Sequence, residues 1–366
     1  MDIATAANEI ATGNRECVEF LQRWLERAKK GKMSHVAMAA FFEPDELLTE
    51  SVGAIVAQDT ICGGLDTLRR KIERMVSERI MPYDTEIPAN QVTLNVTGST
   101  LCFDFICWLI GAEMARIRAG APAPLKVCLY RAAQKGVPMP KTQQNMLENV
   151  VIPVIATIGA EINKVPGGRS DFAMLHKDIV AAHKAGETVP TLKALPAAKA
   201  AIEAILEGCG KPIVITLREA EYTAHRNSHI PAWIRFARDL TAKGELVVFV
   251  RDTAKAEEEI PGFATFAAAS SDIHMRVALY EYAKANLFVA NGPATLNWHM
   301  DTPFLMFSEL DHKHRSSYEA AYPEWWLPNM GIEAGSQFPW FNERQRIVWE
   351  TDSYRNISAA WERAQI

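Results

Sequence analysis

The sequence predicts an α/β protein in which two Rossmann-like domains face a cleft, preceded by a small N-terminal α+β module. Apolar runs of strand length alternate with amphipathic helical segments in two separate series, over roughly 91–190 and 211–310. Alternating strands and helices form parallel sheets with right-handed crossovers, so each series predicts one sheet. The chain has 366 residues, of which 48% are hydrophobic, and is therefore long enough to build a core in each domain.

The first 80 residues differ in pattern from the rest of the chain. ECVEFLQRWLERAKKGK has apolar residues at helical spacing, SHVAMAAFF and SVGAIVA have the length of short strands, and GGLDTLRRKIERMVSERI is a second amphipathic helix. Residues 1–80 are therefore predicted to form a helix–hairpin–helix module. MPYDTEIPANQ, with two prolines and little hydrophobic pattern, is predicted to be a linker.

The first series is predicted to form an N-terminal Rossmann-like domain over residues 91–200. Its strands are QVTLNVTG and PLKVCLYRA, and its helices are STLCFDFICWLIGAEMARIRAG and QQNMLENVVIPVIATIGA, with AAKAAIEAILEGCG following. Pro153 lies inside the second helix and should kink or restart it, because proline has no N–H to donate.

The second series is predicted to form a C-terminal Rossmann-like domain over residues 211–345. Its strands are PIVITLR, ELVVFVRD, NLFVAN and PFLMF. Its helices are IPAWIRFARDLTAKG and DIHMRVALYEYAKA, and PATLNWHM begins another. Residues 346–366 are expected to carry a terminal helix that can pack back on the N-terminal domain.

Composition and charge narrow the function classes. A net charge of −5 provides no global basic field to attract nucleic acid or an anionic membrane. The six cysteines show no CxxC spacing, which is typical of reduced thiols. The N-terminus has neither a basic region nor an apolar run, and no apolar run reaches about eighteen residues. We therefore expect no signal peptide, no transmembrane segment and a cytoplasmic protein.

Polar residues follow the strands of the second series where open α/β sheets bind their ligands. Arg218 and Glu219 end the first of these strands, and Arg226 and Asn227 lie in the same loop. The next strand ends at Arg251. Because a guanidinium group can hold a phosphate with two parallel hydrogen bonds, these residues are candidates for binding a diphosphate.

Two further candidates lie at helix starts. Ser271 and Asp272 are predicted either to cap a helix or to lie near the base or ribose of a nucleotide. Asn291 and Gly292 end a strand directly before a helix that contains Thr295. A helix N-terminus attracts anions, so this turn is either a phosphate site or an ordinary strand-to-helix connection.

These residues lie in a segment that resembles a known enzyme class. VITLREAEYTAHRNSHIPAWIRFARDL, LVVFVRD and HMRVALYEYAKANLFVANGPATLNW are similar to a family of bacterial surface-carbohydrate glycosyltransferases of GT-B fold. They resemble fucosyltransferases more remotely, and TLNVTGSTLCFDF resembles the first turn of a GT-B acceptor domain. The resemblance covers about 91–310 and leaves residues 1–80 outside.

The resemblance implies roles for individual residues. Arg218 would hold the diphosphate, the backbone near Gly292 would oppose it, and Ser271 and Asp272 would lie near the base or ribose. The chain departs from the pattern because it has no doubled strand-terminal arginine. It also has Gly-Pro where other GT-B groups have glycine followed by serine or threonine, so the donor stays open.

The reaction needs a base that takes the proton of the acceptor hydroxyl. Asp104, Glu219 and His225 are the candidates. Asp104 follows the first strand-to-helix turn, but a carboxylate is also favoured in the first turn of a helix by the dipole. The sequence leaves the choice open.

The sequence therefore predicts a metal-independent glycosyltransferase with a nucleotide-sugar as co-substrate and no cofactor. Its acceptor would be a hydroxyl of a glycan, a protein or, against the acidic charge balance, a modified DNA base. The alternatives are a nucleotide-sugar epimerase, a DNA-base-modifying glycosyltransferase and a non-catalytic nucleotide-sugar-binding protein. The oligomeric state is not predicted.

Other motifs are missing or weak. No GxGxxG, Walker A loop, GxSxG, HExxH or DxD-type pair occurs. Asp311, His312 and His314 are ligand-type side chains in a charged loop, where solvation is the preferred interpretation over metal binding.

Overall fold

The computed structural model describes residues 90–96, 101–130, 139–163, 176–221, 224–251, 255–309 and 327–366. The chain divides into two compact units, and the larger comprises Thr100–Val127, Val137–Ile162 and Phe172–Ile366. All candidate catalytic and donor-binding residues belong to this larger unit. The predicted module of residues 1–80 and the Asp311, His312 and His314 motif lie outside the described residues.

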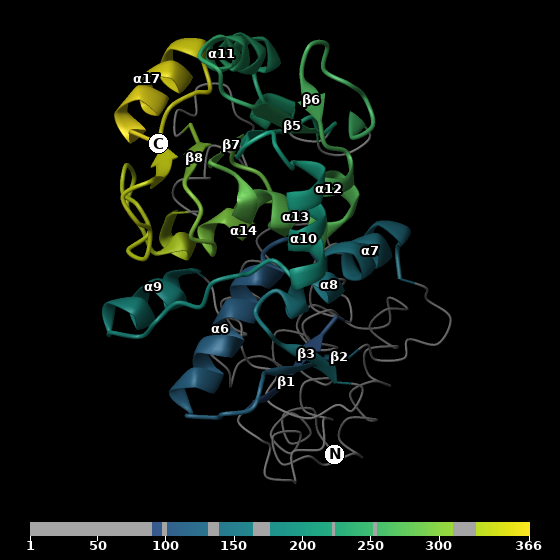
Figure 1. Cartoon of the computed structure of the whole chain (residues 1–366). Helices are drawn as coiled ribbons and strands as arrows, with labels where there is room; N and C mark the ends of the chain where they lie inside the picture. Colours follow the sequence, from purple (N-terminus) through teal and green to yellow (C-terminus); the bar gives the residue numbers. More distant parts are fainter. Residues whose placement is uncertain are drawn as a thin grey trace, which may run out of the picture. The chain divides into compact units, whose positions relative to one another are not determined.

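A six-stranded parallel sheet organises the larger unit (Figure 1). The strand order is β6-β5-β4-β7-β8-β9. From β4 the chain first adds strands on one side of the sheet and then, from β7 onward, on the other side, as in a doubly wound sheet. The strands are β4 (Ile213–Leu217), β5 (Val247–Arg251), β6 (Ala264–Thr265), β7 (Ala285–Val289), β8 (Phe304–Phe307) and β9 (Gln345–Val348). The predicted α/β class with a parallel sheet is confirmed, whereas β6 and β9 were not predicted.

The sheet is built from strands that are buried along their whole length. Every residue of β4, β5, β7 and β8 is buried, which explains why their sequences are continuous apolar runs. The helices between them are α11 (Ile230–Ala242), α12 (Ala268–Ser271), α13 (Ile273–Tyr282) and α14 (Ala294–Trp298). Helix α11 buries Trp233, Phe236, Ala237 and Leu240, which share one face at helical spacing.

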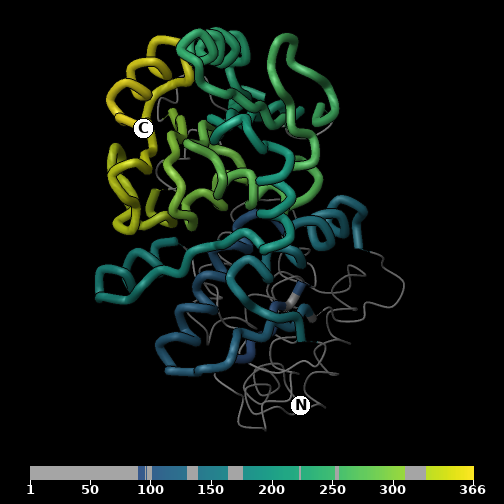
Figure 2. The backbone as a smooth tube through the Cα atoms, viewed as in Figure 1, coloured from purple at the N-terminus to yellow at the C-terminus, as the bar shows by residue number. Residues whose placement is uncertain are grey.

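The C-terminal helix α17 (Tyr354–Ala364) packs against α11. In Figure 2 the yellow end of the chain runs beside the coil of α11. Ile357, Ala360 and Ala364 of α17 join the same hydrophobic core as Trp233 and Phe236. The apolar face of α17 is therefore buried beside the second sheet, and packing of residues 346–366 on the N-terminal domain stays a prediction.

The first predicted series forms a second, smaller sheet. Its strands β1 (Gln91–Asn95), β2 (Lys126–Tyr130) and β3 (Glu161–Asn163) lie in the order β1-β2-β3. The helices that precede β4 in the chain are α6 (Phe105–Arg118), α7 (Lys141–Met146), α8 (Ile152–Ala156), α9 (His176–Lys184) and α10 (Pro196–Ile205). Within the described ranges, no helix is both long enough and apolar enough to cross a membrane.

The helix that contains Pro153 changes its hydrogen-bond pattern just before the proline. A π-helical segment, η1 (Leu147–Val151), separates α7 from α8. Pro153 lies in the first turn of α8, directly after this π-helical segment.

Candidate functional site

The candidate site lies beyond the carboxyl ends of the adjacent strands β4 and β7, where the strand order of the sheet reverses. Strands β4 and β7 pair in parallel, with Thr216 beside Phe288, so their carboxyl ends are neighbours. Arg218 follows β4, and Ala290 follows β7. Arg226, from the short helix η2 (Ala224–Arg226), reaches across and donates from Nη2 to Ala290 O at 3.2 Å. The structure therefore brings the predicted Arg218 loop and the end of β7 to one edge, where such sheets bind ligands.

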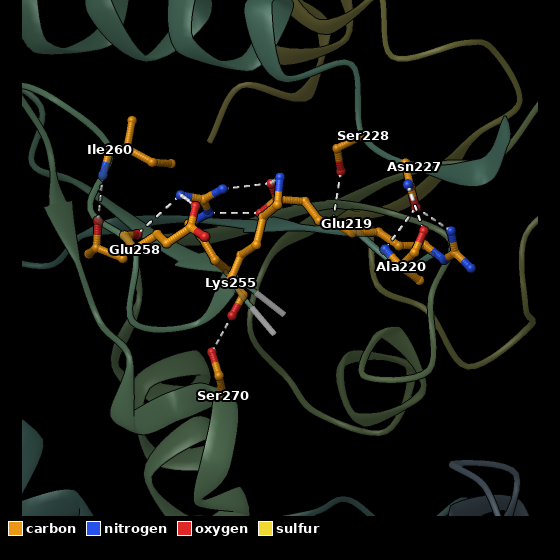
Figure 3. A network of polar contacts seen from close by, with 11 residues as sticks. Glu219, Ala220, Asn227, Ser228, Lys255, Glu258, Ile260 and Ser270 are labelled. Carbon is orange, nitrogen blue, oxygen red and sulfur yellow. Dashed lines mark hydrogen bonds and ion pairs between the residues drawn. The ribbon is translucent and has the colours of Figure 1, made fainter. Parts of the chain in front are cut away.

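The loop after β4 is closed by a ladder of hydrogen bonds. Arg218 N donates to Ser228 Oγ at 2.9 Å, and Ser228 N donates to Arg218 O at 3.0 Å. The Asn227 amide accepts from Ala220 N at 3.0 Å and donates to Ala220 O at 2.9 Å (Figure 3). Asn227 Oδ1 also accepts from Arg218 Nη1. Asn227 therefore shapes the loop and orients Arg218, whose side chain is largely buried.

Glu219 and Arg251 form a buried ion pair. Arg251 Nε and Nη2 donate to the two Glu219 oxygens at 2.8 Å and 2.7 Å, and the Glu219 side chain is only 4% exposed. Lys255 Nζ lies 3.6 Å from the same carboxylate, and Figure 3 shows Lys255 and Glu258 beside it. The hydrogen bond from Arg251 to Glu219 raises the pKa of Arg251. This geometry contradicts Glu219 as a free base and Arg251 as an open phosphate ligand, because each is bound to the other.

Ser271 and Asp272 lie at the start of α13. Asp272 Oδ1 accepts from His274 N at 2.8 Å and from Met275 N at 3.2 Å, and the exposed Ser271 hydroxyl donates to Ala268 O at 3.5 Å. Asp272 is therefore an N-cap, as one of the two sequence hypotheses predicts.

The turn between β7 and α14 is tightly filled. Asn291 Oδ1 accepts from Ala294 N at 2.9 Å, and Thr295 is buried. A methyl group on Gly292 would lie 2.5 Å from Cδ2 of Phe103, the residue two positions before α6. Glycine is therefore needed here so that the Phe103 ring can approach the backbone. Helix α14 has only five residues, and the phosphate expected at Gly292 stays a prediction.

Asp104 directly follows Phe103, the residue whose ring lies against Gly292. It is exposed at the N-cap position of α6, but its carboxylate makes no capping hydrogen bond. Its Oδ2 accepts from Cys102 Sγ at 3.3 Å. Burial, reinforced by Asp104, raises the pKa of Cys102 to about 11, so the thiol stays protonated at neutral pH and can donate to this bond. Asp104 therefore presents a carboxylate that is not used to hold the helix.

His225 lines a small hollow of about 70 Å³ at the carboxyl ends of β7, β8 and β9. The hollow also contains Arg226, Glu309, Glu350 and Asp352. The last three acids were missed by the sequence predictions. Glu350 and Asp352 follow β9, and that strand has only four residues, with a mixed burial pattern that gives no clear strand signal.

No three His, Cys, Asp or Glu side chains in the described part of the chain gather closely enough to hold a metal ion.

Comparison with known proteins identifies no family for the chain. No family model and no curated protein matches the sequence. Among solved structures, ADP-heptose lipopolysaccharide heptosyltransferase II of E. coli is 10% identical, with a TM-score of 0.41, and the match covers 75% of this chain and 100% of that one. A family 9 glycosyl transferase of Veillonella parvula is 10% identical, with a TM-score of 0.41, covering 76% and 90%.

A third solved structure is the iron-containing dodecameric glycosyltransferase TibC of enterotoxigenic E. coli, which is 13% identical with a TM-score of 0.39, covering 72% and 65%. All three proteins are named glycosyltransferases, the class that the sequence resembles. At this level of identity and TM-score, the likeness assigns no reaction to the chain.

Proposed function

We propose that the chain is a glycosyltransferase that moves a sugar from a nucleotide-sugar donor to a hydroxyl group. The donor diphosphate would bind beyond the carboxyl ends of β4 and β7. The observation that carries the proposal is the pair of arginines at this edge of the sheet. Arg218 extends from the end of β4 and is oriented by Asn227, and Arg226 spans to the end of β7. Two guanidinium groups at a topological switch point are suited to a diphosphate.

The proposed reaction follows from this charge distribution. The bond between the sugar and the diphosphate breaks as the acceptor oxygen bonds to the same carbon. Arg218 and Arg226 stabilise the negative charge of the leaving diphosphate, which supports a mechanism without an essential metal. Asp104 or His225 takes the acceptor proton, since both are exposed.

The other predicted residues have supporting roles in this proposal. Glu219 and Arg251 hold the loops after β4 and β5 together, Asn227 closes the Arg218 loop, and Asp272 caps α13. Residues 91–200 and 211–345 would then contribute the acceptor and donor sides. The acceptor, the sugar and the base are open to experiment.

Thermal shift against UDP, GDP, CDP, ADP, TDP and CMP tests the proposed donor site. A nucleotide at about 100 times its Kd adds roughly 2.7 kcal/mol to the free energy of unfolding, because it binds only the folded state. We expect one nucleoside diphosphate to raise the Tm of the wild type, and Arg226→Gln and Arg218→Lys to remove most of that rise. Arg363→Gln, an exposed arginine on α17, is the matched control and should keep it.

Transfer is then tested with the sugar conjugate of the nucleotide that binds. Asp104→Asn and His225→Gln should keep donor binding, and the variant that loses turnover identifies the base. If no nucleotide raises the wild-type Tm, the proposal is wrong. An epimerised sugar released without an acceptor would assign the site to an epimerase instead.

A further inference from the structure

The loop of residues 101–104, which leads into α6, is fixed by hydrogen bonds along its backbone. Leu101 is buried, and its N–H donates to Gln143 Oε1 of α7. The next three carbonyl oxygens accept from the first N–H groups of the helix: Cys102 O from Phe105 N at 3.2 Å, Phe103 O from Ile106 N at 3.0 Å and Asp104 O from Cys107 N at 3.0 Å. The backbone therefore satisfies the start of α6, and the Asp104 carboxylate is not needed as its cap.

The ring of Phe103 anchors this loop to the turn between β7 and α14. A methyl group on Gly292 would lie 2.5 Å from Cδ2 and 3.2 Å from Cε2 of Phe103, so the ring lies directly against the glycine backbone. Gly292 is two residues after Ala290, whose carbonyl oxygen accepts from Arg226, and two residues span at most about 7 Å. The contact therefore ties the start of α6 to the edge of the sheet at which the two arginines of the proposed site lie.

Asp104 is the exposed residue of the loop. Its Oδ2 accepts from Cys102 Sγ at 3.3 Å, and burial raises the pKa of that thiol to about 11, so the thiol is protonated at neutral pH. A thiol is a weak donor, so this bond can be exchanged for a stronger one from a hydroxyl group. The carboxylate therefore combines a fixed backbone with a weakly held side chain, which suits a group that accepts a proton from a substrate.

We propose that Phe103 is a positioning residue, and that packing of its ring on Gly292 holds the Asp104 carboxylate at the arginine edge of the sheet. This rests on the proposed function, in which the acceptor oxygen passes its proton to Asp104 and bonds to the sugar carbon. The diphosphate leaves with the electron pair of the broken bond, beside Arg218 and Arg226. Position matters because a displacement of about 1 Å can slow a reaction about 100-fold. Phe103 therefore acts through Asp104 and need not touch the substrate.

The first measurement uses the full chain without any substrate. Cys102 is alkylated with iodoacetamide, and peptide mass spectrometry gives the rate at this residue. We expect Gly292→Ala to raise that rate about tenfold, because the added methyl group displaces the Phe103 ring and with it the adjacent thiol. Phe103→Leu, combined with Gly292→Ala, leaves room for the methyl group and should restore most of the protection. The exposed Cys209 is the internal reference, and its rate should not change.

Ile357→Ala, which leaves a cavity in the core between α17 and α11, is the matched control for loss of stability alone. It should leave the alkylation rate of Cys102 close to that of the wild type. An equal rise in Ile357→Ala and Gly292→Ala would overturn the proposal, since the thiol would then be exposed by unfolding of the whole chain. This outcome does not depend on whether any nucleotide binds.

The second measurement follows the release of free sugar from the nucleotide-sugar whose nucleotide raises the Tm, with water as the acceptor. We expect Gly292→Ala to lower kcat about 100-fold with the donor KM unchanged, added Phe103→Leu to restore part of kcat, and Ile357→Ala to keep both. A raised donor KM with unchanged kcat would assign Gly292 to the diphosphate and overturn the proposal. Loss of turnover in His225→Gln with turnover retained in Asp104→Asn would overturn it too. If no nucleotide binds, the proposed function fails, and the alkylation rates still decide whether Phe103 holds the loop.

Discussion

Gly292 has no side chain, and this allows the Phe103 ring from a distant segment to lie against its backbone. We expect Gly292→Ala to lower the free energy of unfolding by about 1–3 kcal/mol, since its methyl group would meet the Phe103 ring at 2.5 Å. Urea denaturation measures this loss. In a Phe103→Ala background the same substitution should cost much less. Equal losses in both backgrounds would contradict the contact.

The Glu219–Arg251 pair makes the second prediction at the residue scale. We expect Arg251→Met to cost about 3–5 kcal/mol in the free energy of unfolding, because it removes the two hydrogen bonds and the nearest positive charge from the buried Glu219 carboxylate. The double variant Glu219→Gln with Arg251→Met removes that charge and should recover part of the loss, measured by chemical denaturation. Additive losses would show that the two side chains do not act as a pair.

At the scale of single elements, we expect the stability of helix α13 to depend on its N-cap residue Asp272. Asp272→Ala removes the acceptor of two backbone N–H groups, and we expect it to lower the free energy of unfolding by about 1 kcal/mol. Asp272→Ser, which keeps an acceptor, should lose less. The neighbouring Ser271→Ala is the control and should be close to neutral, since its hydroxyl is exposed. A loss of nucleotide-induced thermal shift in Asp272→Ala, without loss of stability, would instead assign Asp272 to the ligand.

The whole molecule should lose stability in mild acid because of its buried histidines. Burial lowers the pKa of His176 from 6.5 to about 4, and the rings packed on it belong to Trp298, His299 and Phe338. The unfolded chain binds a proton at His176 below pH 6.5, whereas the folded protein does so only near pH 4. Stability from this group is therefore present above pH 6.5 and is lost as the pH falls to about 4, by about 3 kcal/mol in total.

Comparison of the wild type with His176→Phe isolates this contribution, because acids elsewhere titrate equally in both proteins. We expect the free energies of unfolding to differ by about 3 kcal/mol more at pH 7 than at pH 4, with the variant less sensitive to acid. Parallel pH profiles, measured by urea denaturation, would show that His176 is not kept neutral by the fold.

Four of the six strands of the large sheet were predictable from the sequence because their signals are local. The strands β4, β5, β7 and β8 are unbroken apolar runs, α11 repeats its apolar residues at helical spacing, and Asp272 stands directly before α13. The irregular helix at Pro153 is likewise a local effect, because proline has no N–H to donate. The position of Arg218 at a strand end follows from the same local pattern.

Only the tertiary structure decided which of these residues meet. The strand order places β4 beside β7, Phe103 approaches Gly292 across 189 positions of the chain, and Arg251 binds Glu219 across 32. The stacking of His176 on His299 likewise joins distant segments. Local propensity and periodicity carry no information about such contacts, because they depend on how buried surfaces of separate elements fit together. The sequence by itself therefore determined most strands and helices of the large sheet and the candidate arginines. Packing decided which acids are held in ion pairs, which glycine must lack a side chain and which histidines are buried against each other, because these contacts join segments that are distant in the chain.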